Sequence, residues 1–334
     1  MTPISLTAVA SAFPERIVPN SFFGDEDHRP GGGMFRGSRH RHHLVPGETA
    51  LSLIAQAARR LEADTGQSIA DGLDIILTNV SLPDLPFTGC GAEVARELGA
   101  RPQWVFDLHN HGCVSFIAML ALAQSLMTTT GARRALLCNA QTAAGRIFAD
   151  PGVRRLPQAC VPGDGCGVAL IEAGDTRPIE HIGVRNYPAW ASDMQIASSE
   201  GADWWEPRQE QFHIDFSRAK VAKVVGRGNR IVPEVVGEAL RHAGLGPDDV
   251  SLLVTNQPNP IFLRNWREAL QVPAERHLDT FAEHGNLFGA GIPVCLDRAV
   301  QQGRLSDGDN VVLGGFSHAG DYAAAAVVRW RSAA

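Results

Sequence analysis

The chain carries a weak internal repeat that restricts the folds open to it. Residues 74–80, DIILTNV, resemble residues 251–257, SLLVTNQ, and the two segments lie 177 positions apart in a chain of 334 residues. Each segment is an apolar run containing a Thr-Asn pair, and short apolar runs are typical of buried strands. Because the offset is close to half of the chain length, the repeat favours two similar halves.

Elements of the same type follow in the same order around each copy. The helix-like stretches ALSLIAQAARRL (50–61) and VPEVVGEALRHAG (232–244) precede the two copies. A helix, a short strand, a Gly-containing turn, a longer helix and an apolar strand follow each copy, and the short strands are WVFDL and HLDTF. This alternation predicts an α/β fold with buried central strands. Convergent α/β patterning without duplication is the alternative.

The boundary between the halves is predicted near residues 172–177, which follow the strand-like run CGVALI. We therefore expect an N-terminal half over residues 1–174 and a C-terminal half over residues 175–334. Two segments fall outside the repeat: residues 21–47, which are Gly-rich and basic, and residues 187–215, which hold three tryptophans. Both are expected to be loops or caps over a site.

Composition narrows the possible partners and compartments. Thirty Lys and Arg against 36 Asp and Glu give a net charge of −6, without the basic excess typical of nucleic-acid binding. No apolar run approaches the ~20 residues of a membrane span, and the first residues lack the charged region of a secretory signal. The six cysteines show no Cys-x-x-Cys spacing. We expect a cytoplasmic protein with reduced thiols and with neither nucleic-acid nor membrane partners.

Cys113 is the strongest candidate for a catalytic residue. It follows the strand-like WVFDL and the turn HNHG, and it opens the helix-like run CVSFIAMLALAQSLM. The positive end of a helix macrodipole stabilises a thiolate, so we expect a lowered pKa for this thiol. A strand-turn-helix unit also presents a side chain on a sharp bend, as nucleophile elbows do. The alternative is a buried structural cysteine, which we expect for the other five.

Several motifs, taken in order, resemble one family. Besides the Cys113 region, they are PGDGCGVALI (162–171), TNQPNPIFLR (255–264), EHGNLFGAGIP (283–293) and the C-terminal GGFSHAGDYAAAAVVRW. Together they resemble the thiolase-fold ketoacyl-carrier-protein synthase III family and its acyltransferase relatives, over essentially the whole chain. The resemblance implies a thiolase-like αβαβα sandwich of two pseudo-duplicated halves and a homodimer. It also implies an acyl-phosphopantetheine thioester as substrate, carried by an acyl carrier protein or by coenzyme A, with no tightly bound cofactor.

The resemblance assigns roles to three polar residues. It implies that Cys113 takes the acyl group and that Asn286, in the Gly-Asn motif, helps to stabilise an enolate. The catalytic His of the family opens a His-Gln-Ala-Asn motif, and Asn256 stands in its place here. An Asn side chain can donate a hydrogen bond to an oxyanion but cannot exchange a proton near pH 7. We therefore expect thioester polarisation to survive and general-base catalysis from this position to be lost.

Other histidines are candidates for the missing base. His284, in the Gly-Asn turn, is placed to deprotonate a bound hydroxyl or amine. His109 and His111 flank the nucleophile turn and can form a Cys–His pair, and His318 stands in the C-terminal Gly-rich loop. For each of them the alternative is a structural histidine, bonded within its loop or packed beneath a turn.

The resemblance also implies an oxyanion hole and contacts to the acyl donor. One oxyanion donor is the backbone N–H of Cys113, and the second is that of Ala319 or Gly320 in the C-terminal loop. Arg36 matches an Arg that lies over the nucleotide of coenzyme A, although a glycine replaces the stacking Trp four residues earlier. Phe87 matches a residue that crosses the dimer interface into the acyl pocket of the other subunit, with an ordinary interface or core Phe as the alternative.

A carrier protein, whose phosphopantetheine arm lacks the adenine, does not need the stacking Trp. Arg36, Arg39 and Arg41 are therefore a candidate surface for an acidic carrier protein, with a solvated basic loop as the alternative. The histidines of the adjacent HRHH lack further ligands at a suitable spacing, so no metal is expected. The PGDGCG segment (162–167) is expected to be a scaffold turn, because no Lys follows it as in a phosphate loop.

We expect an acyltransferase that loads an acyl group on Cys113 and passes it to a hydroxyl or amine of a small-molecule acceptor in specialised metabolism. The loss of the family's His favours this reaction over decarboxylative Claisen condensation with a malonyl thioester, which is the alternative. A non-catalytic partner subunit of a ketosynthase is a further alternative, against which the Cys113 elbow and Asn286 argue.

Overall fold

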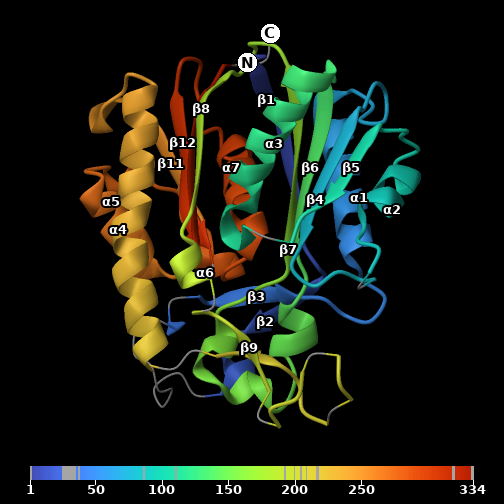
Figure 1. Ribbon diagram of the computed structural model, residues 1–334, viewed down its shortest axis with the longest axis vertical. Coiled ribbons are helices and arrows are strands. Elements are labelled where there is room, and N and C mark those ends of the chain that lie inside the picture. The colour runs from blue at the N-terminus through green and yellow to red at the C-terminus, as the bar shows by residue number, and fades with distance from the viewer. Residues whose placement is uncertain are drawn as a thin grey trace.

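The chain folds into five layers in which helices and sheets alternate (Figure 1). One sheet comes from the N-terminal half and the other from the C-terminal half, with helices outside each sheet and between the two. The computed structural model describes residues 2–24, 35–36, 38–85, 87–109, 111–191, 193–198, 200–203, 205–207, 209–215, 218–317 and 320–331. The αβαβα order confirms the predicted fold class.

The N-terminal sheet is mixed and has five strands. Their order is β1 (Ile4–Ala12), β7 (Gly165–Ala173), β6 (Arg134–Gln141), β4 (Ile75–Val80) and β5 (Trp104–Asp107). β4 runs parallel to β5 and β6, whereas β7 runs antiparallel to β6 and β1. Every residue of β4 is buried, as expected of a strand covered on both faces. The outer helices are α1 (Ala50–Thr65) and α2 (Gly91–Glu97).

The C-terminal sheet repeats this arrangement with four strands. Their order is β11 (Leu252–Thr255), β12 (Asn310–Ser317), β13 (Tyr322–Arg329) and β8 (Ile179–Asn186). β11 and β12 are parallel and the other pairs are antiparallel, so β11 is the counterpart of β4. The predicted strand HLDTF is wrong beyond a single bridge between His277 and Leu253. The chain turns directly into the short helix α6 (Phe281–His284), so among the described residues this edge of the sheet has no fifth strand.

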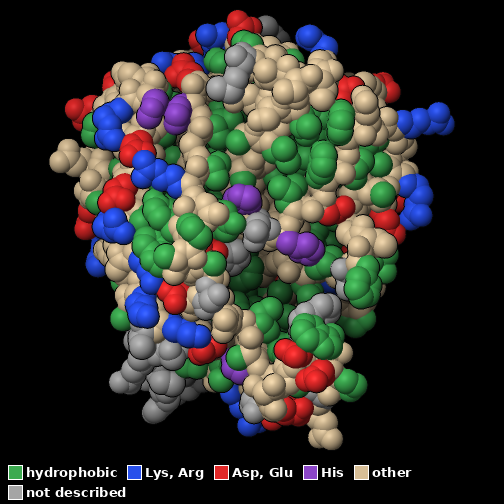
Figure 2. Space-filling view, viewed as in Figure 1, with side chains coloured by type: hydrophobic (Ala, Val, Ile, Leu, Met, Phe, Trp, Pro, Cys, Tyr) green, Lys and Arg blue, Asp and Glu red, His purple; other side chains and the backbone are tan. Residues whose placement is uncertain are grey.

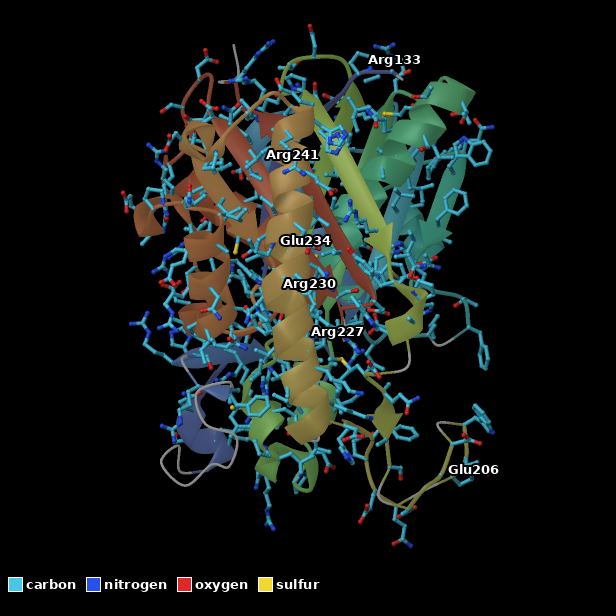
Figure 3. All side chains as sticks on the ribbon, turned by 60° about the vertical axis from the view of Figure 1, so that its left-hand side comes forward. Arg133, Glu206, Arg227, Arg230, Glu234 and Arg241 are labelled. Carbon is cyan, nitrogen blue, oxygen red and sulfur yellow. The ribbon has the colours of Figure 1, made fainter. Side chains whose placement is uncertain are left out.

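Two helices cover the outer face of the C-terminal sheet: α4 (Arg218–His242) and α5 (Pro260–Ala269). The predicted helix over residues 232–244 is only the second part of α4, which continues through Pro233. Figure 3 shows α4 from the side, with Arg227, Arg230 and Glu234 in succession along it. Arg230 and Glu234 are paired at 3.3 Å across one helical turn.

The layer between the sheets consists of α3 (Ser115–Thr130) and α7 (Gly291–Gln301) (Figure 1). Both helices pack into one core cluster with strands of both sheets. By length and composition alone the segment Gly112–Thr130 is apolar enough to cross a membrane, contrary to the expectation from the sequence. Half of it is buried inside the fold, and a core helix of a soluble protein passes the same test, so this finding is weak evidence for a span.

A buried ion pair joins helices of the two halves. Arg60 of α1 donates hydrogen bonds of 3.0 and 2.9 Å to the carboxylate of Asp297 on α7. Ser11 and Gln301 donate to the same carboxylate, which is only 2% exposed. The two halves therefore share one core, and the division at residues 174 and 175 stays a prediction.

The segment predicted as a basic loop contains a strand. β3 (His40–His43) pairs antiparallel with β2 (Arg16–Pro19) beneath the sandwich (Figure 1). Arg41 is fully buried, bonds to Asn20 and Ser38, and lies over the ring of Phe23. It therefore cannot face a carrier protein, and this part of the predicted basic surface is wrong.

The second predicted cap, residues 187–215, is mostly irregular. Its described part contains a two-stranded ribbon of β9 (Ile196–Ala197) and β10 (His213–Ile214). With β2 and β3 it lies at the end of the sandwich opposite the two termini (Figure 1). The expectation of a cap is therefore confirmed in outline.

Candidate active site

A cavity of about 440 Å³ lies where β4 and β11 end against the cap. Its volume is in the range of small-molecule sites, and most of its lining is apolar. Cys113, Asn256 and Asn286 all line it, so the structure brings the three predicted polar residues together. No Asp, Glu, Lys or Arg occurs among the described lining residues. Figure 2 shows hydrophobic side chains inside a hollow near the centre of one face of the molecule.

Cys113 stands on a sharp turn between β5 and α3. The 3₁₀ turn η3 (Gly112–Val114) carries it, directly before α3 begins at Ser115. His111, just before this turn, has a φ of 71°, a left-handed backbone conformation that residues other than Gly rarely adopt. The predicted strand-turn-helix elbow is therefore present, with the thiol partly exposed to the cavity.

The pKa of this thiol differs from the expectation. Burial raises the pKa of Cys113 to about 12, because the thiolate loses its hydration in the apolar cavity. A hydrogen bond from the side chain of Asn256 acts in the opposite direction and lowers the pKa, whereas the carboxylate of Asp321 raises it. The helix N-terminus was visible in the sequence, but the depth of the cavity was not.

Asn256 is held rigidly beside the sulfur. Its backbone N–H donates to the carbonyl of Gly314 on β12, and its Oδ1 accepts the backbone N–H of Phe316 at 3.2 Å. Because the amide oxygen is occupied, the Nδ2 group is the part of the side chain that is available to the sulfur of Cys113. The residue that replaces the family's His thus provides a fixed hydrogen-bond donor.

Asn286 is fixed in the same manner. Its Oδ1 accepts the backbone N–H of Phe288 at 3.0 Å, while its own backbone pairs with Val161 and Gly163. The residue is 8% exposed and lines the cavity. Its Nδ2 group is therefore available to a bound molecule, as that of Asn256 is to the sulfur.

His284 lies behind the cavity wall instead of in it. Its ring stacks on Phe13 with centroids 4.2 Å apart and lies 5.7 Å from the ring of His42. Burial, together with the nearby charges of His42 and Arg298, lowers its pKa to about 3. His284 is not among the residues that line the cavity, so this geometry does not support the predicted base.

The other candidate bases differ in position. His109 is exposed at the edge of the cavity and lines it, together with His213 from the cap. His111 does not line the cavity, and its ring packs at 4.4 Å from that of Tyr322. His318 lies outside the described residues.

Only part of the predicted oxyanion hole is described. The backbone N–H of Cys113 lowers the pKa of its own thiol, and its role as an oxyanion donor stays a prediction. The N–H of Gly320 donates to the carbonyl of Ser317 at 2.8 Å, so Gly320 is not the second donor in this conformation. Ala319 lies outside the described residues.

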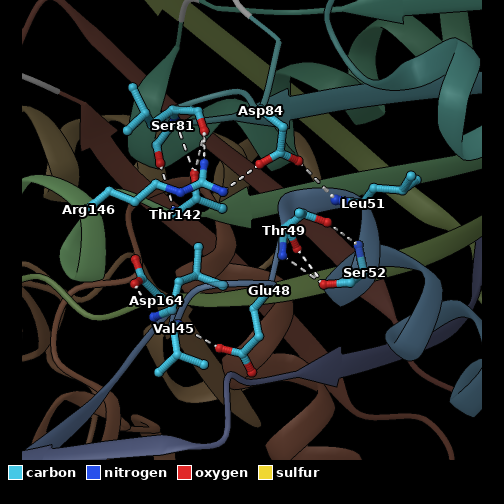
Figure 4. Close-up of polar contacts among 12 residues, drawn as sticks. Val45, Glu48, Thr49, Leu51, Ser52, Ser81, Asp84, Thr142, Arg146 and Asp164 are labelled. Atoms are coloured by element: carbon cyan, nitrogen blue, oxygen red, sulfur yellow. Dashed lines mark hydrogen bonds and ion pairs between the residues drawn. The ribbon is translucent and has the colours of Figure 1, made fainter.

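The PGDGCG segment shapes the cavity wall. The carboxylate of Asp164 accepts three backbone N–H groups, those of Leu44, Ala144 and Gly145, at 2.7 to 2.8 Å. These bonds anchor the π-helical turn η4 (Ala144–Phe148), which supplies part of the lining. Figure 4 shows Asp164 near the contacts of Arg146, which pairs with Asp84 at 2.6 Å. The segment is a scaffold turn, as predicted.

Two carried-over residues lie at the surface. Arg36 is exposed and follows Phe35, whose side chain lines the cavity. Phe87 is 90% exposed. The alternative of a core Phe at position 87 is therefore wrong.

The other cysteines lie in the interior of the fold. The other five cysteines are buried free thiols, as predicted. Within the described part of the chain, no group of three or more His, Cys, Asp or Glu side chains is arranged to hold a metal ion.

Sequence reasoning assigned no role to two further asparagines that line the cavity. Asn259 caps α5 by accepting the backbone N–H groups of Ile261 and Phe262, both at 3.0 Å. Asn79, at the end of β4, occupies the place that Asn256 occupies after β11. The repeated Thr-Asn pair was the signal that could have identified Asn79.

Family models match two regions of the chain. The model described as 3-oxoacyl-[acyl-carrier-protein (ACP)] synthase III matches residues 106–186, and its C-terminal model matches residues 240–330. A β-ketoacyl-[acyl-carrier-protein] synthase III from Gloeobacter violaceus is 30% identical over 326 residues, covering 95% of each chain. One from Rhodobacter capsulatus is 31% identical over 322 residues, covering 91% of this chain and 92% of the relative.

Solved structures support the fold. A 3-oxoacyl-[acyl-carrier-protein] synthase III from Aquifex aeolicus superposes with a TM-score of 0.82 at 22% identity, covering 99% of this chain and 100% of the other. The corresponding synthase from Thermus thermophilus gives a TM-score of 0.82 at 26% identity, covering 98% and 100%. A tetronic acid condensing enzyme gives 0.81 at 21% identity, covering 98% and 100%.

Proposed function

Because the chain belongs to the 3-oxoacyl-[acyl-carrier-protein] synthase III family, we propose that it loads an acyl group on Cys113 and condenses it with a malonyl-type thioester. This reverses the order of preference drawn from the sequence, where transfer to a hydroxyl or amine came first. The observation that carries the proposal is that Cys113 shares one cavity with the fixed amides of Asn256 and Asn286, and that the described lining of this cavity holds no Asp, Glu, Lys or Arg.

Loading exchanges one thioester for another. The sulfur of Cys113 attacks the carbonyl carbon of the donor thioester, the new C–S bond forms and the old one breaks. The proton of the Cys113 thiol ends on the released donor thiol, so the exchange needs no other reactant. Asn256 and the N–H of Cys113 are the described donors that favour negative charge at the sulfur.

Condensation suits the side-chain amides of Asn256 and Asn286, because this reaction needs hydrogen-bond donors and no general base. Loss of carbon dioxide from the malonyl group leaves its electron pair on the adjacent carbon, as an enolate. Fixed N–H donors stabilise the enolate oxygen, and Asn256 and Asn286 both have an Nδ2 group available. The enolate carbon attacks the acyl carbonyl, the C–S bond to Cys113 breaks, and the thiolate takes up one proton.

Transfer to a hydroxyl or amine is the second candidate, favoured by one observation. His109 and His213 line the cavity and can accept the proton that an acceptor loses during attack. The position of His284 behind the wall removes the base on which this reaction first depended. In this case the acceptor would be a small molecule of specialised metabolism.

The donor and the assembly follow from the family. We propose an acyl carrier protein or coenzyme A as the carrier of the thioester, with no tightly bound cofactor, and the exposed Arg36 near the entrance as a donor contact. We also propose a homodimer in the cytoplasm, with Phe87 at its interface and near the acyl pocket of the other subunit. Figure 2 shows further hydrophobic side chains gathered over α3 and beside it.

Intact-protein mass spectrometry after mixing with acyl thioesters tests the loading step. A mass gain equal to the acyl group should appear in the wild type and in Cys160→Ala, which removes a buried thiol, but not in Cys113→Ala. Failure of every acyl-coenzyme A and acyl-carrier-protein donor to load would favour a non-catalytic partner subunit.

A malonyl thioester labelled in its free carboxylate then separates the two reactions. Release of labelled carbon dioxide by the acylated enzyme supports condensation. Retention of the label, with an ester or amide formed from an added acceptor, would overturn condensation in favour of transfer.

A further inference from the structure

The two halves place equivalent asparagines beside the same cavity. Asn79 follows Thr78 near the end of β4, and Asn256 follows Thr255 at the end of β11. Both residues line the cavity that contains Cys113. The side chain of Asn256 lowers the pKa of Cys113, whereas that of Asn79 bonds to the chain on either side of the nucleophile.

Asn79 bridges the two ends of the turn that carries the nucleophile. Its Nδ2 donates to the carbonyl of Leu108, directly after β5, at 2.7 Å. Its Oδ1 accepts the hydroxyl of Ser115, the first residue of α3, at 2.9 Å. Leu108 precedes Cys113 by five residues and Ser115 follows it by two. One side chain thus spans the whole loop from strand to helix.

A second buried amide completes the network. The Nδ2 of Asn139 on β6 donates to the same Ser115 hydroxyl at 2.8 Å. Asn79 is 6% exposed, Ser115 1% and Asn139 0%. Breaking one bond of such a buried network is costly, because the group that loses its partner has no water molecule to bond to instead.

The network is also closed from the C-terminal half. A Cβ atom at Gly289 would lie 2.5 Å from the Ser115 hydroxyl and 2.7 Å from the Oδ1 of Asn79. The close approach of this glycine leaves no space for either group to turn away. The turn of Cys113 is therefore clamped from β4, β6 and the C-terminal half together.

We propose that Asn79 is a positioning residue for Cys113, which holds both ends of the nucleophile turn so that the sulfur keeps its place in the cavity. This inference rests on the proposed role of Cys113 as the nucleophile. Asn79 acts through the two loop ends and not on the substrate. Its loss should therefore slow acyl loading while the KM for the thioester donor stays nearly unchanged.

The test combines loading with a chemical probe that needs no substrate. In Asn79→Ala we expect single-turnover loading and the alkylation of Cys113 by iodoacetamide each to slow by about 10- to 100-fold, as for a nucleophile displaced by about 1 Å. The effect of Asn79→Ala should be much smaller in an Asn256→Ala background, because the position of the sulfur relative to the Asn256 amide then no longer matters. Ser115→Ala cuts the far end of the bridge and should slow both steps in the same direction.

Asn310→Ala is the matched control. Asn310 is 7% exposed and its Nδ2 donates to the carbonyl of Asp249 at 2.9 Å, remote from the cavity. It should lose comparable stability and keep wild-type alkylation. Alkylation at the wild-type rate or faster in folded Asn79→Ala, or in Ser115→Ala if Asn79→Ala does not fold, would overturn the proposal. If no thioester loads the wild type, the proposed function fails, and alkylation still tests Asn79.

Discussion

The side chain of Asn256 lines the same cavity as Cys113 and lowers the pKa of its thiol, while its amide oxygen accepts the backbone N–H of Phe316. The bond to Phe316 leaves the Nδ2 end of the amide available to the cavity. A hydrogen-bond donor at this point stabilises negative charge on sulfur or on a bound carbonyl oxygen, but it takes no proton. The reactivity of the thiol therefore depends on how far this donor offsets burial.

Removing the donor should make Cys113 less reactive. In Asn256→Ala the pKa of the thiol rises further, and at pH 8.5 alkylation by iodoacetamide should slow by about 10- to 100-fold, the equivalent of one hydrogen bond to a charged group. Asn265→Ala on α5, whose amide bonds to Asn229, is the control.

The same assay checks the raised pKa itself. Because burial holds the pKa of Cys113 near 12, the wild-type alkylation rate should climb steadily between pH 7 and pH 10, and a plateau below pH 9 would contradict that value.

Asn256→His supplies an imidazole in the cavity of Cys113 and should raise the rate of alkylation at pH 7, because a Cys–His pair forms thiolate near neutrality.

Removing the buried carboxylate of Asp297, which pairs with Arg60, should destabilise the fold strongly. Asp297→Ala leaves Arg60, Ser11 and Gln301 without their shared acceptor, so we expect a loss of about 3–5 kcal/mol of unfolding free energy. Chemical denaturation measures the change. Arg59→Ala breaks an exposed pair at 3.7 Å with Glu97 and should cost no more than about 1 kcal/mol. Similar costs for the two variants would contradict the burial argument.

Buried histidines should make the fold sensitive to acid. Burial, with the charges of Arg41, Arg16 and His42, lowers the pKa of His43 to about 3, and neither of its ring nitrogens has a hydrogen-bond partner among the described residues. The unfolded chain takes up a proton as the pH falls through 6.5 and the native state does not, so stability falls from about pH 6.5 towards pH 3.

Replacing this histidine should remove part of that loss. Between pH 7 and pH 5, the unfolding free energy of His43→Phe should fall by about 2 kcal/mol less than that of the wild type. This difference follows from the gap between the pKa of His43 in the unfolded chain and in the native state. Thermal or urea unfolding at the two pH values measures the difference. The exposed His242→Phe is the control and should follow the wild type; a parallel course for His43→Phe would count against the assignment.

A methyl group at Gly289 should disturb the turn of Cys113 from outside. Its Cβ would lie 2.5 Å from the hydroxyl of Ser115, so Gly289→Ala should cost about 1–3 kcal/mol of stability and slow alkylation of Cys113. Gly226→Ala in α4 has no atom within 4 Å of its new Cβ and should be neutral or stabilising by up to about 1 kcal/mol. Equal melting temperatures for the two variants would refute the close packing.

The sequence predicted the elements whose periodicity is continuous. α1, α3, β4 and β7 follow their apolar patterns closely. It missed β3, because HRHH reads as a solvated basic segment. The partners that let Arg41 be buried include Asn20 and Phe23, which lie far from it in the sequence. It placed a strand at HLDTF because local pattern does not report where the chain turns away from a sheet edge.

The candidate site was predictable where sequence motifs mark its residues. Motif order predicted that Cys113, Asn256 and Asn286 come together, because each stands at a position that the sequence marks: a turn before a helix, a strand end and a Gly-Asn turn. His284 was misplaced because two residues of separation from Asn286 do not say which side of a wall a ring occupies. The pKa of Cys113 was predicted in the wrong direction for a similar reason, since desolvation depends on residues from the whole chain.

The paired positions of Asn79 and Asn256 have a consequence for how such a centre can change. In an assembly of two identical subunits, a substitution at one of these positions would appear at both. Because the two halves are joined in a single polypeptide, each copy is free to vary separately. Asn79 can hold the turn of Cys113 while Asn256 acts on the reacting groups. A substitution at residue 256 can therefore change reactivity without weakening the bonds by which residue 79 holds the turn.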